Sequence, residues 1–213
     1  MTPHDMTPRT EELCRLAPII PVLVVEDAAT AADLARALVA GGLPALEVTL
    51  RTPAALDVIR EMATVEGGRV GAGTLLTPKD VEAALEAGAT FGVSPGATDR
   101  LLDACEANGL PLLPGAATAT EAMRLLERGY TVQKFFPAEA SGGAAALKAI
   151  GAPIPQVRFC PTGGVSLANA SDYLSLPNVL CAGGSWVAPK DAVQASDWSR
   201  VESLAREAAA LQR

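Results

Sequence analysis

The stretch ALEVTLRTPAALDVIREMATVEGGRVGAG, residues 45–73, decides the fold. It begins with a short apolar run at 45–50, continues with apolar residues at helical spacing, and ends in a second short run at 70–72. The double glycine at 67–68 is typical of a helix end. A helix between two buried strands predicts a βαβ unit, whose two strands are parallel.

The same alternation extends over most of the chain. Short runs rich in Val, Ile and Leu occur at 18–25, 45–50, 70–72, 91–94, 111–113, 132–135, 157–160 and 179–182. Runs that are apolar on both faces and alternate with helices predict a parallel sheet covered by helices. Eight such units predict an α/β fold of the (β/α)₈ TIM-barrel type. An open doubly wound sheet gives the same local pattern and is the structural alternative.

Capping signals mark where several helices begin. Thr52-Pro53 and Thr77-Pro78 place a capping hydroxyl before a proline, and the segment 118–121 has capping-box spacing. We expect one domain, 1–213, with a flexible tail at 1–9. A short N-terminal helix at 10–16 is expected to cap the barrel floor. A helix at 199–212 is expected to close the chain.

The composition excludes several classes of function. The chain has 213 residues, with 17 Lys and Arg against 24 Asp and Glu, which gives a net charge of −7. Nucleic acids and anionic membranes require clustered basic residues, so neither is an expected partner. The one histidine, His4, lies in the expected tail, which nearly excludes histidine catalysis. With no secretory signal or membrane-length apolar run, a cytoplasmic protein is expected.

The cysteines do not predict a metal centre. They show no C-x-x-C pair and no zinc-site spacing, and are expected to be free, buried thiols. They are Cys14, Cys105, Cys160 and Cys181.

Lys134 is the most informative candidate residue. It lies in YTVQKFFP, residues 130–137, at the end of the sixth predicted strand and beside two phenylalanines. Desolvation disfavours the ammonium form, and the free amine is the nucleophile for a Schiff base with a ketone or aldehyde. Pairing with Glu139 or extension to solvent is the structural alternative. The other lysines belong to a helix start, a helix and a polar loop: Lys79, Lys148 and Lys190.

The second predicted strand carries polar residues on one face. Period-two alternation in LEVTLRT, residues 46–52, places Glu47, Thr49 and Arg51 on the inner side. Glu47 is a candidate acid/base, and Arg51 is a candidate clamp for a carboxylate. An ion pair between Glu47 and Arg51 that serves packing is the alternative, and it is compatible with catalysis.

Two glycine-rich segments follow the last two predicted strands. CPTGGV at 160–165 and CAGGSW at 181–186 bring backbone N–H groups close to an anion, and a following helix start adds a favourable dipole. These two loops are the recurrent phosphate site of the TIM barrel. Ser185 adds a hydroxyl. Thr74, after the third strand, adds another hydroxyl donor.

From 18 to the carboxyl terminus, the chain resembles the family of 2-keto-3-deoxy-6-phosphogluconate and 4-hydroxy-2-oxoglutarate aldolases. The resemblance implies a class I aldolase on a TIM barrel, usually a homotrimer, with neither metal nor other cofactor. The substrate would be a phosphorylated keto acid, cleaved to pyruvate and glyceraldehyde 3-phosphate. The motifs are LEVTLRT (46–52), GAGT (71–74), SPG (94–96), KFFPAE (134–139), RFCPTGGV (158–165) and GGSW (183–186).

The resemblance also implies roles for individual residues. Lys134 would form the Schiff base and Glu47 would be the general acid/base, while Arg51 and Thr74 would hold the pyruvate carboxylate. The residues matching the phosphate site are Gly163, Gly164, Gly184 and Ser185. Those expected to line the pocket are Thr49, Pro95, Phe136 and Thr162.

Three other functions are compatible with parts of the sequence. An aldolase for the galactonate epimer differs only in the C4 stereochemistry of its substrate. A phosphate-binding isomerase or epimerase would share the glycine-rich loops, and a metabolite-binding barrel would share the fold. Neither of these last two needs a pair such as Lys134 and Glu47.

Overall fold

The computed structural model describes residues 2–212 as alternating strands and helices. The strands are β1 (Ile19–Leu23), β2 (Ala45–Thr49), β3 (Arg69–Gly73), β4 (Phe91–Val93), β5 (Leu112–Leu113), β6 (Gly115–Ala116), β7 (Val132–Phe135), β8 (Arg158–Pro161) and β9 (Ala182–Gly184). The helices are α1 (Pro3–Arg15), η1 (Ala28–Thr30), α2 (Ala31–Ala40), α3 (Ala55–Met62), α4 (Pro78–Glu86), α5 (Asp99–Asn108), α6 (Ala119–Arg128), α7 (Gly143–Gly151), α8 (Ala170–Leu174), α9 (Lys190–Gln194) and α10 (Trp198–Ala209).

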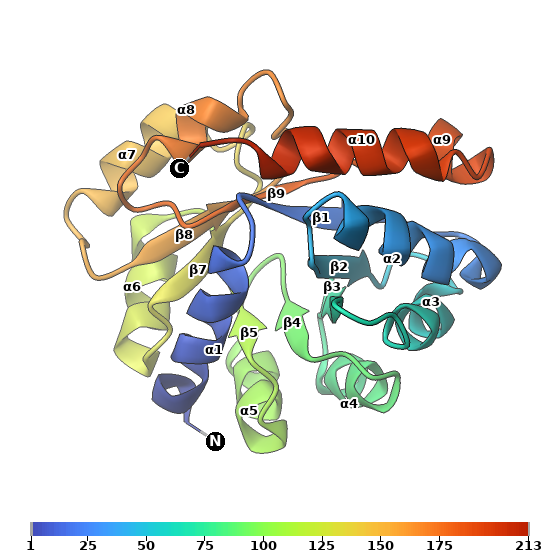
Figure 1. Cartoon of the computed structure of the whole chain (residues 1–213). Helices are drawn as coiled ribbons and strands as arrows, with labels where there is room; N and C mark the ends of the chain where they lie inside the picture. Colours follow the sequence, from blue (N-terminus) through green and yellow to red (C-terminus); the bar gives the residue numbers. More distant parts are fainter. Residues whose placement is uncertain (1, 213) are drawn as a thin grey trace.

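The strands form two parallel sheets. One has the order β5-β4-β3-β2-β1-β9, and the other has the order β6-β7-β8. The fold is therefore α/β, with parallel strands that curve as a half-barrel (Figure 1). Neighbouring strands follow chain order except where the last strand, β9, pairs with the first, β1, whereas a doubly wound sheet reverses its order at a switch point.

The two sheets approach each other at both edges. Only Pro114, which has no N–H to donate, separates β5 from β6. On the other side, isolated parallel bridges join Phe159 to Val179 and Thr162 to Gly183. The predicted last strand at 179–182 therefore begins later, at Ala182, because Val179 makes only a single bridge.

Each strand has an outer and an inner face, as the alternation in 46–52 predicts. Leu46 and Val48 are buried in the large core between the strands and the surrounding helices. A separate inner cluster includes Phe91 and Leu113 together with Leu13 and Cys14 of α1. In Figure 1, α1 lies against β5 and β7, whereas α2 to α6 lie outside the strands. The prediction that an N-terminal helix closes the floor is thus confirmed.

The predicted helix boundaries are confirmed in part. Thr77 and Thr118 are N-caps whose side chains accept from backbone N–H groups in capping boxes. Thr52 is not a cap, because its hydroxyl donates to the Val25 carbonyl at 2.7 Å and α3 begins only at Ala55. The expected start of the first helix at residue 10 is also wrong. Thr2 forms a further capping box, so the helix begins at Pro3.

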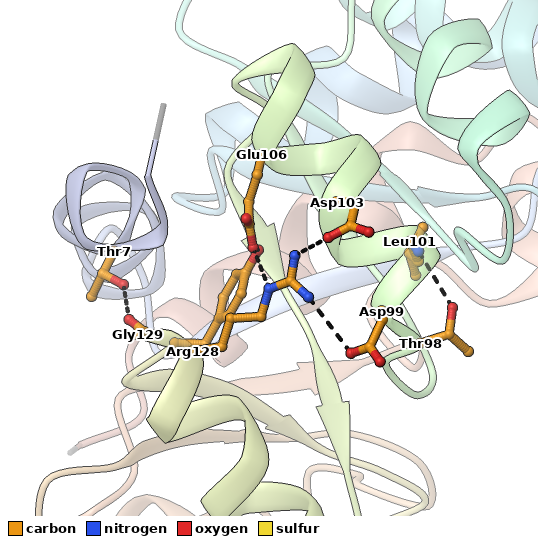
Figure 2. A network of polar contacts seen from close by, with 9 residues as sticks. Thr7, Thr98, Asp99, Leu101, Asp103, Glu106, Arg128 and Gly129 are labelled. Carbon is orange, nitrogen blue, oxygen red and sulfur yellow. Dashed lines mark hydrogen bonds and ion pairs between the residues drawn. The ribbon is translucent and has the colours of Figure 1, made fainter.

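A polar network joins α5 to the end of α6 (Figure 2). The Arg128 guanidinium is paired with Asp99 at 3.6 Å, Glu106 at 2.7 Å, and Asp103. Glu106 also accepts a hydrogen bond from the Tyr130 hydroxyl at 3.1 Å. One arginine thus holds three carboxylates near each other.

Replacing Arg128 by alanine is expected to destabilise the fold by about 1–3 kcal/mol, because the three carboxylates lose their shared partner. Urea unfolding monitored by circular dichroism measures this change. Arg36→Ala is the matched control, since Arg36 pairs with a single carboxylate among residues 2–212, that of Asp33 on an exposed helix surface. It should cost no more than about 0.5 kcal/mol. Equal losses in the two variants would contradict the stabilising role of the network.

Candidate active site

A cavity of about 320 Å³ is formed where several strands end. All the predicted site residues line it except Gly184, and Arg51 and Thr74 lie just beyond the ends of β2 and β3. The carboxyl ends of parallel strands are where α/β barrel enzymes build their sites. The residues brought together are Glu47, Thr49, Arg51, Thr74, Pro95, Lys134, Phe136, Thr162, Gly163, Gly164 and Ser185.

Gly184 is replaced in the cavity wall by Gly183. A Cβ atom on Gly184 would lie 1.8 Å from the Trp186 ring, so residue 184 faces away from the cavity. Successive residues of a strand point to opposite faces. The alternation of faces along the strand that begins at Ala182 was the signal that could have identified Gly183 as the residue facing the cavity. Sequence reasoning also missed Val22, the register partner of Glu47, and Val165.

Lys134 and Glu47 form a buried ion pair in the wall of the cavity. The Lys134 Nζ lies 3.4 Å from Glu47 Oε1. Lys134 is 5% exposed and Glu47 is 3% exposed, and within residues 2–212 no other charged side chain is buried. A buried ion pair contributes little to stability, since desolvation offsets its attraction. Its place in a cavity therefore indicates a functional role.

The contacts of Lys134 decide between the catalytic and the structural interpretations of this residue. The Nζ lies 5.1 Å from the centre of the Phe136 ring, within range of a cation–π contact. Among residues 2–212, Lys134 pairs with Glu47 and not with Glu139, which instead accepts a hydrogen bond from the Tyr173 hydroxyl. Burial, followed by that hydrogen bond, raises the pKa of Tyr173. The phenol therefore stays protonated as a donor.

The remaining lysines are all exposed. They are Lys79, Lys148 and Lys190. Lys190 pairs with Glu26 at 2.9 Å, on the surface of the molecule. Lys134 thus differs from them in burial, as its sequence context predicted.

Arg51 and Thr74 also line the cavity. The guanidinium of Arg51 is exposed and pairs with no carboxylate within residues 2–212, so the alternative Glu47–Arg51 ion pair is not formed. Thr74 has a φ of 63°, a left-handed conformation that is rare for a β-branched residue. Such strain costs about 1–3 kcal/mol and clusters at functional sites.

Thr49 has a structural contact as well as a place in the cavity wall. Its hydroxyl donates to the Leu23 carbonyl at 2.9 Å, which ties β2 to β1. The side chain is 1% exposed. Thr49 therefore fixes the strand that carries Glu47.

The glycine-rich loop after β8 lines the cavity. Gly163 and Gly164 have φ values of 99° and 79°, which only glycine adopts without strain. Within the described part of the chain, the N–H group of Gly164 donates no hydrogen bond. Ser185, on the loop after β9, lines the same cavity. Successive backbone N–H groups in a turn of this kind can form an anion-binding concavity.

The helix starts expected at this end are not adjacent to the loops. The helix after Gly164 begins at Ala170, and the helix after Ser185 begins at Lys190. An anion bound at these loops would therefore be held by backbone N–H groups of the loops, without the favourable dipole of an adjacent helix start.

The cysteines and acidic residues offer no metal centre. Among residues 2–212, no cluster of His, Cys, Asp or Glu is arranged to hold a metal ion. All four cysteines are free and buried, as predicted. Hydrogen bonds with Cys14 and Cys160, together with burial, raise the pKa of Cys181.

Within residues 2–212, no helix is both long and apolar enough to cross a bilayer.

Comparison with known proteins agrees with this geometry. Residues 10–204 match the family described as KDPG and KHG aldolase. The 2-dehydro-3-deoxy-phosphogluconate aldolase of Pseudoalteromonas atlantica is 54% identical over 202 residues, which cover 94% of each chain.

Two solved structures extend the comparison to the fold. The 2-keto-3-deoxy-6-phosphogluconate aldolase of Zymomonas mobilis, solved with 3-phosphoglycerate, has a TM-score of 0.93 at 49% identity and covers 97% of this chain and 98% of its own. The KDPG aldolase of Legionella pneumophila, with pyruvate captured as a covalent carbinolamine, has a TM-score of 0.91 at 44% identity. That match covers 94% of this chain and 98% of the Legionella chain.

Proposed function

The chain belongs to the family of KDPG and KHG aldolases, and we propose that Lys134 and Glu47 perform its chemistry. It is a class I aldolase, a carbon–carbon lyase that cleaves 2-keto-3-deoxy-6-phosphogluconate to pyruvate and glyceraldehyde 3-phosphate. The reaction proceeds through a lysine Schiff base without a separate cofactor. The observation that supports our assignment is the buried contact of 3.4 Å between Lys134 Nζ and Glu47 Oε1.

The first half of the proposed reaction forms the Schiff base. The neutral amine of Lys134 attacks the C2 ketone, and Glu47 moves the protons that convert the adduct to a carbinolamine. Loss of water, assisted by a proton from Glu47, gives the iminium ion. The capture of pyruvate as a carbinolamine in the Legionella pneumophila relative supports this order of steps.

The second half breaks the carbon–carbon bond. The Glu47 carboxylate removes the proton of the C4 hydroxyl, the C3–C4 bond breaks, and its electron pair enters the iminium group. Glyceraldehyde 3-phosphate leaves, and an enamine of pyruvate remains on Lys134. Glu47 returns a proton to C3, and water then hydrolyses the iminium ion to pyruvate and the free amine.

The two charged ends of the substrate have separate proposed partners. Arg51 and Thr74 hold the carboxylate, because a guanidinium and a hydroxyl line the same cavity as Lys134 and Glu47. Gly163, Gly164 and Ser185 hold the phosphate, and Gly184 contributes at most its backbone N–H. Thr162, Pro95 and Phe136 complete the wall. Binding a remote phosphate orients the reacting bond.

Ser185→Asp tests the phosphate site, because a carboxylate there repels a phosphate. The KM for 2-keto-3-deoxy-6-phosphogluconate is expected to rise by about 10-fold or more, an effect of at least 1.4 kcal/mol. The KM for 4-hydroxy-2-oxoglutarate, which has no phosphate, should change less than about 2-fold. Steady-state kinetics on both substrates measures the difference. Ser175→Asp, on an exposed surface, is the matched control. Equal changes for both substrates would refute the assignment.

Several broader properties are part of the same proposal. Cleavage of 4-hydroxy-2-oxoglutarate to pyruvate and glyoxylate follows from the family and from a centre that does not itself require phosphate. Closure of residues 1–213 into one eight-stranded barrel is supported by the parallel bridge from Thr162 to Gly183. A homotrimer in the cytoplasm, acting in the Entner–Doudoroff pathway, follows from the family resemblance. The exposed apolar side chains Val24 and Leu76 are candidates for its interface.

A further inference from the structure

The inner face of β3 has no side chains next to Glu47. In β3, Val70 and Ala72 belong to the outer core, so Gly71 and Gly73 occupy the inner positions. The β2–β3 register pairs Glu47 with Gly71, and Thr49 with Gly73. Two successive inner positions are therefore empty beside the strand that carries the candidate acid/base.

Two different side chains fill these empty positions. A Cβ atom on Gly71 would lie 2.5 Å from three ring atoms of Phe91, which belongs to the inner floor cluster. A Cβ atom on Gly73 would lie 2.3 Å from Glu47 Oε1 and 2.9 Å from Glu47 Cδ. Gly71 thus makes room for the floor, whereas Gly73 makes room for the carboxylate.

The backbone does not explain the glycine at position 73. Gly73 is not among the residues with positive φ, and it lies within a regular parallel strand. Alanine adopts this conformation without strain. The requirement for glycine is therefore one of space, and the space is that of the Glu47 carboxylate.

We propose that Gly73 is a positioning residue for Glu47, holding its carboxylate against Lys134 through the gap that it leaves in β3. This inference rests on the proposed acid/base role of Glu47. Carbon and oxygen atoms without a bond between them stay about 3.3 Å apart, so a methyl group at 73 displaces Oε1 by about 1 Å. Oε1 is the atom that lies 3.4 Å from Lys134 Nζ. A misplacement of about 1 Å can lower a rate about 100-fold.

Gly73→Ala tests the proposal. The exchange of pyruvate methyl protons for solvent deuterium, followed by NMR, reports proton transfer at the enamine. Exchange and kcat are expected to fall at least about 10-fold, while KM changes less than about 2-fold, because the carboxylate and phosphate partners are not displaced. Melting temperature should change little, since the end of a flexible side chain can move aside.

Two glycine variants are matched controls. Gly71→Ala introduces the same methyl group on the same face of β3, but against the Phe91 ring. It should lower the melting temperature more than Gly73→Ala does and slow proton exchange less. Gly96→Ala places its Cβ where nothing lies within 4 Å, and it should leave both quantities unchanged.

A double-mutant cycle separates positioning from a general structural effect. In a Glu47→Gln background, Gly73→Ala should have almost no further effect on proton exchange, because the carboxylate is already absent. Losses that add would overturn the proposal, as would a Gly73→Ala variant that exchanges at the normal rate or fails to fold. If Glu47→Gln alone is slow while Gly73→Ala is normal, only the role of Gly73 fails. If Glu47→Gln alone is normal, the proposed function of Glu47 fails with it.

Discussion

Lys134→Met is expected to lower kcat/KM by at least about 10⁴-fold, because a thioether cannot form an imine with the C2 ketone. The rate of pyruvate release from 2-keto-3-deoxy-6-phosphogluconate measures the loss. Lys148→Met, on the exposed surface of α7, is the control and should retain full activity. A Lys134→Met variant with more than about a hundredth of the normal rate would contradict covalent catalysis by this residue.

The same substitution removes the partner of a buried carboxylate. Leaving one member of a buried ion pair alone costs about 3–5 kcal/mol, so Lys134→Met is expected to be less stable as well as inactive. Lys134→Arg separates the two effects, because it keeps a cation beside Glu47 but has no nucleophilic amine. We expect it to be inactive yet more stable than Lys134→Met in thermal unfolding. Activity in Lys134→Arg would exclude the Schiff base at this position.

Glu47→Gln has the second largest expected effect. The amide keeps the shape of the side chain but cannot accept and return protons, so kcat should fall by about 10²- to 10⁴-fold. The KM should change little, since the proposed partners of the carboxylate and phosphate are intact. Steady-state and single-turnover kinetics on the phosphorylated substrate measure both quantities.

A surface variant is the control for Glu47→Gln. Glu26→Gln removes a carboxylate that pairs with Lys190 on the exposed surface. It should leave kcat within about 2-fold of normal. If Glu47→Gln instead raises KM with kcat unchanged, Glu47 binds substrate rather than moving protons.

The parts of the site that could be predicted follow from strand periodicity. Alternation in 46–52 assigns Glu47 and Arg51 to the inner face, and the structure places both in the cavity wall. The context of Lys134, between buried strand residues and Phe136, was enough to distinguish it from the exposed lysines. Both patterns are local, so a few neighbouring residues determine them.

The parts that could not be predicted depend on residues distant in the sequence. Thr52 has the pattern of a helix cap, but its hydroxyl reaches the Val25 carbonyl on the neighbouring strand. The first helix begins at Pro3 because the cap at Thr2 outweighs the expected fraying of a terminus. The direction in which Gly184 faces depends on Trp186, which occupies the space beside it.

The glycines of β3 are a further feature that local sequence patterns could not predict. In the sequence, residues 71–74 indicate backbone donors and the Thr74 hydroxyl. The structure adds a steric role, since the Glu47 carboxylate fills the space beside Gly73. That role arises from the register between β2 and β3, which no local pattern specifies.

Borohydride reduction in the presence of pyruvate, followed by peptide mass mapping, tests the central claim most directly. Reduction converts the imine to a stable secondary amine and marks the lysine that formed it. We predict one adduct per chain, on the peptide that contains Lys134, and none when pyruvate is omitted. The absence of an adduct, or an adduct on Lys79, Lys148 or Lys190, would contradict the mechanism.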